Sequence, residues 1–245
     1  VIYANNSIKS AFDMALYDIA AQHAGMPLYK FIGGDNSITI VTDYTVSISD
    51  PQKMAADAVK IKEQGYPAIK VKLGKNGKLD VERMKAIRAA EHCEEPIARW
   101  DFMRLPKVKA ASPIPIMADE CCGDDHDAER LIALKACDYF NIKLGKSGGI
   151  FKGLKMVRMA EAAGLHLQVG AMIESRLAMT GFAHFALCSP DIVHFDFDTA
   201  LMLKEDPVAG GIVYAANGVV KVPDANGLGA TIDESVLKKL EKVVI

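Results

Sequence analysis

The sequence predicts an α/β fold of the TIM-like (β/α)7β type, a barrel in which strands and helices alternate. Seven strand-like segments recur at regular spacing, helix-like segments separate them, and several of the strands end in a lysine or a carboxylate. Strict alternation implies a parallel sheet with right-handed crossovers. In a parallel barrel the carboxyl ends of the strands share one rim, which is where such folds carry out chemistry.

The predicted elements follow from short β-branched or apolar runs and from apolar residues at helical spacing. The strands are residues 38–46, 68–73, 92–95, 114–119, 139–144, 165–172 and 192–198. One helix, residues 7–23, precedes the barrel. The helices between the strands are residues 51–64, 79–90, 127–136, 150–163 and 177–188. Beyond Pro207 the rhythm changes to a hairpin, 212–214 with 219–222 around Asn217-Gly218, and then to a helix over 233–243.

Helix boundaries are marked by local signals. Gly25 is a stop for the first helix, and Asp50-Pro51 is an N-cap followed by proline at the first helical position. Gly164 ends the helix that starts at Ile150. The join at Ala90-Glu91, by contrast, runs from helix to strand with no Gly, Pro or Asn. Because the common closed barrel has eight strands, the sequence predicts that one strand–helix unit is absent at this join.

Composition narrows the class of protein. The chain has 245 residues, half of them apolar, and a net charge of −2, which favours neither nucleic acid nor a membrane surface as a partner. No apolar run reaches the length that spans a bilayer, and the N-terminus lacks the pattern of a signal peptide. The five cysteines are scattered, and Cys121 and Cys122 are adjacent, so reduced thiols and a cytoplasmic location are expected.

Lysines gather at the predicted rim. Lys70 and Lys72 are two residues apart on one strand and therefore share a face, and Lys143 and Lys146 flank Gly145 at the end of another. Lysines that face a barrel interior are costly unless they are paired or functional. The alternative is that Lys70 and Lys72 point outward from a solvated edge strand.

Carboxylates occupy the same rim. Glu94 and Asp119 end two neighbouring predicted strands, where two carboxylates could hold one hard dication. Asp196 and Asp198 share a face of the last strand and require a cation, which could be a metal ion, a lysine or a substrate ammonium group. Glu174 follows the strand before it. Each carboxylate, taken alone, could instead be a capping residue or bond to loop amides.

These residues lie in motifs that resemble the muconate-lactonizing branch of the enolase superfamily (the mandelate racemase/muconate lactonizing enzyme family), and most closely its dipeptide epimerases. The matching strings are IKVKLG (69–74), CEEP (93–96), IMADE (116–120), NIKLGKSGG (141–149), VGAMIES (169–175) and DFDT (196–199), together with AFDMALYDI in the first helix and GLG at 227–229. The resemblance covers nearly every residue, and the motifs are specific when taken jointly.

The resemblance implies roles for these residues and Mg²⁺ as the cofactor. Lys72 and Lys143 resemble the two opposing catalytic bases. Lys70 and Lys146 resemble lysines that support these bases, and Glu94 and Asp119 resemble the Mg²⁺ ligands. Asp196, Asp198 and Glu174 resemble substrate-binding residues, and the Asp196–Asp198 pair would bind the α-ammonium group of a dipeptide. The implied reaction is inversion of the dipeptide α-carbon by two-base proton transfer through an enediolate.

The resemblance also sets expectations for what the chain lacks. Residues 1–36 would be the remnant of an N-terminal capping domain, 37–206 the barrel, and 207–245 a hairpin and helix that pack back on the capping region. No residue matches the family's third metal ligand, an Asp on the strand missing at Ala90-Glu91. A muconate cycloisomerase, an N-acylamino acid racemase and a catalytically impaired, ligand-binding remnant therefore remain alternatives. Barrels of this kind often assemble, so a homo-oligomer is compatible with the sequence.

Overall fold

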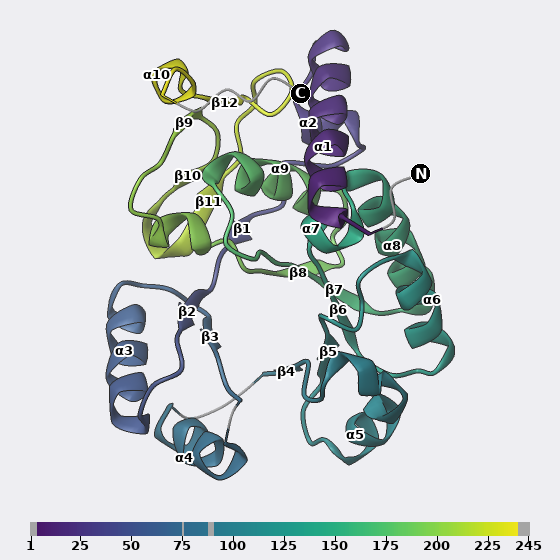
Figure 1. Ribbon diagram of the computed structural model, residues 1–245, viewed down its shortest axis with the longest axis vertical. Helices are drawn as coiled ribbons and strands as arrows, with labels where there is room; N and C mark the ends of the chain where they lie inside the picture. Colours follow the sequence, from purple (N-terminus) through teal and green to yellow (C-terminus); the bar gives the residue numbers. More distant parts are fainter. Residues whose placement is uncertain (1–3, 75, 88–90, 240–245) are drawn as a thin grey trace.

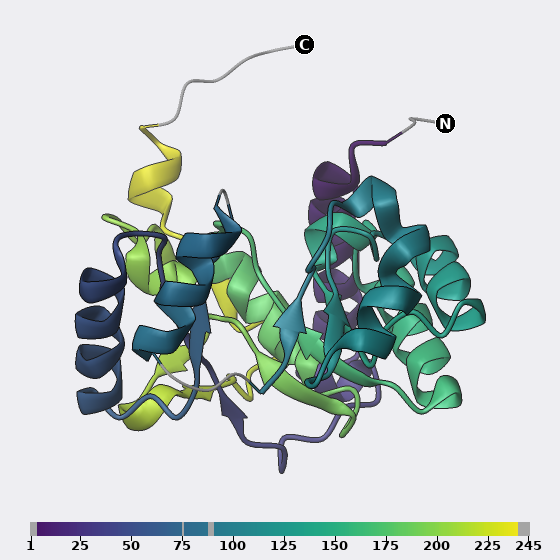
Figure 2. The same ribbon diagram turned by 90° about the horizontal axis from the view of Figure 1, so that it is seen from below.

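A computed structural model of the protein describes residues 4–74, 76–87 and 91–239 (Figure 1). Seven parallel strands form two curved sheets with helices on their outer side (Figures 1 and 2). The larger sheet has the order β4-β5-β6-β7-β8. Its strands are β4 (Cys93–Glu94), β5 (Ile116–Ala118), β6 (Tyr139–Ile142), β7 (His166–Val169) and β8 (Ile192–Phe195). The smaller sheet pairs β2 (Tyr44–Val46) with β3 (Ile69–Val71).

The two sheets meet on one side of the barrel only. The backbone N–H of Asp43 donates to the carbonyl of Phe195 at 3.0 Å, which joins the β2 end of the smaller sheet to β8. On the opposite side, no backbone hydrogen bond links β3 to β4 within the described residues. The predicted absence of a strand–helix unit falls at this opening, although Ala90 of the predicted join lies outside the described residues.

The helices follow the predicted alternation. They are α1 (Asn6–His23), α2 (Leu28–Phe31), α3 (Pro51–Glu63), α4 (Gly77–Ile87), α5 (Leu105–Ala111), α6 (Asp125–Ala133), α7 (Leu144–Ser147), α8 (Ile150–Ala163), α9 (Arg176–Ala186) and α10 (Glu234–Leu237), with 3₁₀ turns at Arg99–Arg104, Thr199–Met202 and Ala216–Gly218. The Asp50 side chain accepts from the backbone N–H of Lys53 at 2.8 Å, which confirms the predicted N-cap of α3. Gly164, at φ 67°, confirms the predicted end of α8.

Several regions differ from the sequence prediction, which contained neither α2 nor α7 and which extended a strand to Leu144, the first residue of α7. The single strand predicted over residues 38–46 is divided into β1 (Ile40–Val41) and β2. Thr42 and Asp43 lie between them, and β1 pairs with β11 while β2 pairs with β3. The segment between β4 and β5, for which no helix was predicted, contains a 3₁₀ turn and α5.

The core is unequally divided between the two sheets. The larger core fills the space between β5–β8 and the helices α6, α8 and α9, and Phe140, Phe182 and Phe185 are almost completely buried in it. A smaller separate core, Val46, Met54, Ala58 and Ile61, holds α3 against β2 and β3. The smaller sheet therefore depends less on the main core than the larger sheet does.

The first helix has its apolar stripe at the surface. Ile8, Phe12, Leu16 and Ile19 have the predicted helical spacing, but between 59% and 70% of each residue's surface is exposed. Helix α1 packs on α7 and α8 through its other face, where Ser10 is buried. The periodicity thus predicted the helix correctly but not which face is covered.

The C-terminal segment that follows the barrel strands packs against the N-terminal segment that precedes them. Strand β11 (Val219–Lys221) pairs antiparallel with both β10 (Val213–Tyr214) and β1, and β12 (Ala230–Ile232) pairs with β9 (Val208–Gly210). The backbone N–H of Leu28 donates to the carbonyl of Gly227 at 2.8 Å. Part of the predicted last helix, residues 240–243, lies outside the described residues. Among the described helices, none has the length and apolar character needed to cross a bilayer.

His184 is a buried link between α9 and these two segments. Its Nδ1 accepts from the backbone N–H of Tyr29 at 3.1 Å, so its Nε2 carries the proton and donates to the carbonyl of Leu228 at 3.1 Å. An imidazolium ring, protonated on both nitrogens, could not accept the hydrogen bond from Tyr29. Burial lowers the pKa of His184 from 6.5 to about 4.

We therefore expect His184 to make stability fall with acidification. A histidine whose pKa is lower in the folded state stabilises the fold fully above the unfolded pKa and loses that contribution as the pH falls toward the folded pKa. Between pH 7 and pH 5 the loss should be about 2 kcal/mol, measured as the free energy of unfolding in urea. His184→Gln should lower stability at pH 7 and flatten this dependence. His23→Gln, at the exposed end of α1, is the control, and an equal slope in both variants would contradict the assignment.

Candidate active site

Lys70 is the centre of the first of two charge networks inside the barrel. It lies on β3, its side chain is only 8% exposed, and its Nζ lies 3.0 Å from Glu94 Oε2 and forms an ion pair with Asp196. Burial alone would lower the pKa of Lys70, but the Asp196 and Glu94 carboxylates outweigh it and raise that pKa. The alternative of an outward-facing lysine on a solvated edge is therefore wrong for Lys70. The network also brings β3 and β4 side chains together across the opening between the sheets.

The second network is built on Asp119, at the end of β5. Lys143 Nζ donates to Asp119 Oδ2 at 2.6 Å, and Lys146 pairs with the other carboxylate oxygen. Lys143 and Asp119 are both almost completely buried. Burial would raise the pKa of Asp119, but the ammonium groups of Lys146 and Lys143 lower it well below its ordinary value. Asp119 therefore remains ionised and fixes both lysines.

Lys72 differs from the other rim lysines. It follows β3, its side chain is exposed, and in the described part of the chain it makes no ion pair. Partial burial of the amine and the nearby positive charge of Lys70 lower its pKa, and Lys143 contributes in the same direction. Lys72 therefore gives up its proton more readily than a free lysine.

Glu174 lies in the loop after β7. One of its carboxylate oxygens accepts from the backbone N–H of Met172 at 2.6 Å. Burial raises the pKa of Glu174, while the charge of Lys143 opposes that shift. The predicted substrate-binding residue Glu174 therefore lies within electrostatic reach of Lys143.

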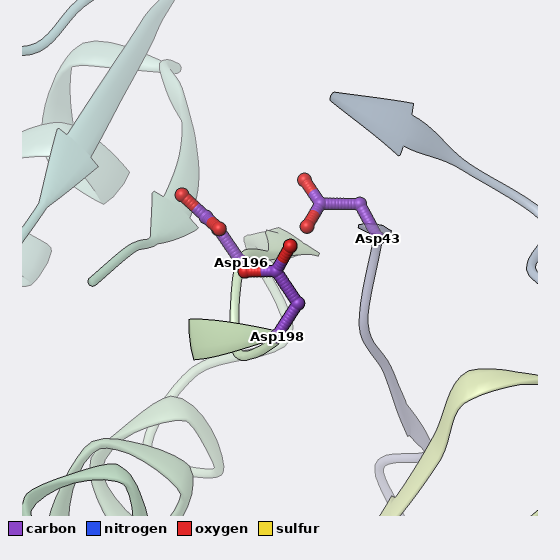
Figure 3. A group of neighbouring side chains, drawn as sticks. All are labelled: Asp43, Asp196 and Asp198. Carbon is purple, nitrogen blue, oxygen red and sulfur yellow. The ribbon is translucent and has the colours of Figure 1, made fainter. Parts of the chain in front are cut away.

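Three carboxylates, one of them the Asp196 that pairs with Lys70, form a cluster (Figure 3). Asp196 and Asp198 follow β8 as predicted, and Asp43, which sequence analysis missed, approaches from the segment before β2. Ligand oxygens of all three lie within 4.8 Å of one another. Burial and the charge of Asp196 raise the pKa values of both Asp43 and Asp198. An acidic residue inside an apolar, β-branched run was the signal that could have identified Asp43.

Glu94 and Asp119 provide part of a site for a hard dication. Asn141 Nδ2, from β6, donates to Glu94 Oε1 at 2.6 Å. The other amide atom of Asn141, Oδ1, is buried and has no hydrogen-bond partner among the described residues. Oxygen donors of this kind suit Mg²⁺, which proteins often hold through only one or two carboxylates. Within the described residues, however, no third carboxylate completes the pair, and the only group of three potential ligands is Asp43, Asp196 and Asp198.

Two further residues shape this part of the rim, and the sequence did not reveal them as functional. Glu95 has φ 40°, a strained value for a residue with a side chain. Its carboxylate accepts from the backbone N–H groups of Asp119 at 2.8 Å and Cys121 at 3.1 Å, which holds the loop after β5 in place. At Gly170 a Cβ would lie 2.4 Å from Asn141 Oδ1, so only glycine allows the asparagine its position beside Glu94.

The sequence is similar to those of known proteins. Residues 89–236 match the family model described as enolase C-terminal domain-like. The chain is 49% identical to the D-Ala-D/L-Ala epimerase of Cytophaga hutchinsonii, an alignment that covers all of the chain and 75% of that protein. It is 38% identical to the L-Ala-D/L-Glu epimerase of Bacillus subtilis, with 94% of the chain and 72% of that protein covered.

Solved structures agree with the sequence matches. The structure of the Cytophaga hutchinsonii dipeptide epimerase, complexed with Mg and the dipeptide D-Ala-L-Val, has a TM-score of 0.97 over 99% of this chain and 74% of that one. The muconate lactonizing enzyme of Pseudomonas putida is 25% identical, with a TM-score of 0.88 over 97% of this chain and 75% of that one. The protein belongs to the enolase superfamily, in the branch of mandelate racemase and muconate lactonizing enzyme. Within that branch it groups with the dipeptide epimerases, so its enzyme class is that of an isomerase.

Proposed function

We propose that the protein is a Mg²⁺-dependent epimerase that inverts the α-carbon of a dipeptide by proton transfer between Lys72 and Lys143. The observation that carries this proposal is the pair of buried ion-pair networks at one rim, in which Lys70, the neighbour of Lys72 on β3, binds Glu94 and Asp196, and Lys143 binds Asp119. The similarity to epimerases named for dipeptides supports the choice of substrate.

We assign the two lysines opposite roles in this reaction. Lys72, with its lowered pKa, takes the α-proton as a neutral amine, and the electron pair of the broken C–H bond passes into an enediolate. Lys143, an ammonium group held by Asp119, gives a proton to the opposite face of the carbon, which inverts the centre. In the reverse direction the roles exchange. Glu94 and Asp119 would hold Mg²⁺, which when bound would supply Lewis-acid stabilisation for negative charge on the substrate carboxylate.

The remaining predicted residues position the substrate and the reacting groups. We assign the ammonium group of the dipeptide to Asp196 and Asp198, which are both buried and acidic. Lys70 orients Asp196 and Glu94, and Lys146 orients Asp119. Glu174, at the rim near Lys143, is assigned to the substrate as well.

The alternatives within the family are less well supported. A muconate cycloisomerase or an N-acylamino acid racemase would share the lysines and the metal but would not need two buried aspartates for an ammonium group. The impaired-remnant alternative rests on the incomplete barrel. The alignment with the Cytophaga hutchinsonii protein is 277 residues long, against 245 in this chain. The excess is close to the roughly 30 residues per strand–helix unit of such barrels, which supports the proposal that a unit is absent between β3 and β4.

The domain division follows from the same proposal. We assign residues 1–36 to the end of a capping domain, 37–206 to the barrel and 207–245 to a segment that packs on the capping region. The hydrogen bond of the Tyr29 hydroxyl to Asp224 at 2.6 Å supports the last assignment.

Exchange of the α-proton in deuterium oxide tests the function. L-Ala-L-Ala incubated with the protein and Mg²⁺ should gain deuterium at the α-carbon of its C-terminal residue and form the epimer, as measured by NMR, and excess chelator should stop both. An impaired remnant would give no exchange and no calorimetric signal with millimolar Mg²⁺. Exchange that continues unchanged with chelator would contradict the metal dependence.

A further inference from the structure

Asp43 occupies a fixed position that the chain maintains through its backbone. Its N–H donates to the carbonyl of Phe195, the last residue of β8, and its side chain turns toward Asp196 and Asp198 (Figure 3). The backbone N–H of Thr45, two residues further on, donates to Asp198 Oδ2 at 2.6 Å. The segment before β2 and the end of β8 are therefore locked together in the register that gathers the three carboxylates.

The charges of this cluster do not balance. Lys70 is the cation paired with it, and its ammonium group contacts Asp196 and Glu94. Asp43 Oδ1 and Asp198 Oδ1 are both buried and have no hydrogen-bond partner, and Asp198 is completely buried as a residue. A buried carboxylate oxygen without a partner is costly. Two such oxygens, one from the segment before β2 and one from the segment after β8, in a cluster whose carboxylates lie within 4.8 Å of one another, indicate a ligand that is positively charged and donates several hydrogen bonds.

A substrate ammonium group meets these requirements. It carries one positive charge and three donors, which matches three carboxylates, of which two have free oxygens. The nitrogen of an N-acylated amino acid has a single N–H and no charge, so it would leave carboxylate oxygens buried and unpaired. A site built to bond a group strongly rejects an analogue that lacks it.

We propose that Asp43 is a third substrate-binding carboxylate that, with Asp196 and Asp198, makes a free N-terminal ammonium group a requirement for the substrate. The proposal rests on the proposed dipeptide epimerase function and restricts its substrates to peptides with an unmodified N-terminus. Asp43 acts on the part of the substrate remote from the reacting carbon, so its removal affects binding more than chemistry.

The test compares two substrates and two variants. In the wild-type protein, kcat/KM for N-acetyl-L-Ala-L-Ala should be at least about 100-fold below that for L-Ala-L-Ala, because several hydrogen bonds to charged groups are lost. Asp43→Asn should raise KM for L-Ala-L-Ala about tenfold or more with kcat within about threefold, and should leave the calorimetric affinity for Mg²⁺ at Glu94 and Asp119 unchanged. Asp57→Asn, whose carboxylate pairs with exposed Lys53 on α3, is the control and should alter none of these.

Each contrary outcome is distinct. An unchanged KM in Asp43→Asn, or equal turnover of the acetylated peptide by the wild type, would overturn the proposal. A second Mg²⁺ bound per chain and lost in Asp43→Asn would show that the cluster is a metal site instead. If the wild type turns over no dipeptide, the proposed function fails. In that case, calorimetry with the wild-type protein still tests the role of the cluster. The proposal requires L-Ala-L-Ala to bind more tightly than its acetylated form.

Discussion

Lys72→Ala and Lys143→Ala should each abolish inversion of the dipeptide, with kcat reduced by at least about a thousandfold. Inversion needs one lysine to remove the α-proton and the other to supply a proton from the opposite side. Each variant keeps one of the two, so it should still exchange the α-proton of one epimer with deuterium oxide without forming the other epimer. The two variants should act on opposite epimers, which NMR of each pure epimer measures.

The controls for this experiment separate chemistry from folding. Lys78→Ala, an exposed residue of α4, should retain wild-type turnover. Lys143→Ala leaves Asp119 paired with Lys146, so this variant should still fold, which circular dichroism can verify. Inversion that persists in both variants, or exchange of both epimers by either one, would refute the two-base assignment.

The barrel rim was predictable because alternation is a local property. In a parallel barrel the residue that ends a strand lies at the rim whatever its distance in sequence, so the order of strands and helices alone places Glu94, Asp119 and Lys143 together. The pairing was not predictable. That Lys70 would bond both Glu94 and Asp196, while Lys72 forms no ion pair with the described residues, depends on the curvature of the two sheets and not on residue spacing.

Asp43 was missed for a physical reason. The run over residues 38–46 has strand composition throughout, and nothing local shows that it changes partners from β11 to β8 and β3 near Thr42 and Asp43. The same limit applies to α1, where the pattern of Phe12 and Leu16 predicts a helix with an apolar face but not whether that face is covered. Short-range sequence patterns identify helices and strands. Contacts between residues distant in sequence decide which face of each helix or strand is buried and which side chains reach the site.

Asp119 is the carboxylate whose replacement should have the widest effect. It is almost completely buried, it pairs with both Lys143 and Lys146, and it is one of the two proposed Mg²⁺ ligands. Asp119→Asn preserves its shape but leaves two largely buried ammonium groups without a counter-charge. Removing one partner of a buried ion pair costs about 3–5 kcal/mol, so we expect a loss of this order in the free energy of unfolding in urea. Mg²⁺ binding by calorimetry and epimerisation should fall below detection.

Asp125 offers a matched control because it is also a buried carboxylate with two lysine partners, Lys152 and Lys155, but it lies at the start of α6, outside the site. Its lysines are largely exposed, so Asp125→Asn should cost only about 1 kcal/mol and should retain Mg²⁺ binding and turnover. Adding Lys143→Met to Asp119→Asn removes one unpaired charge and should recover part of the lost stability but none of the activity. Wild-type Mg²⁺ affinity in Asp119→Asn would exclude Asp119 as a ligand, since an amide is a much weaker ligand for a hard dication than a carboxylate.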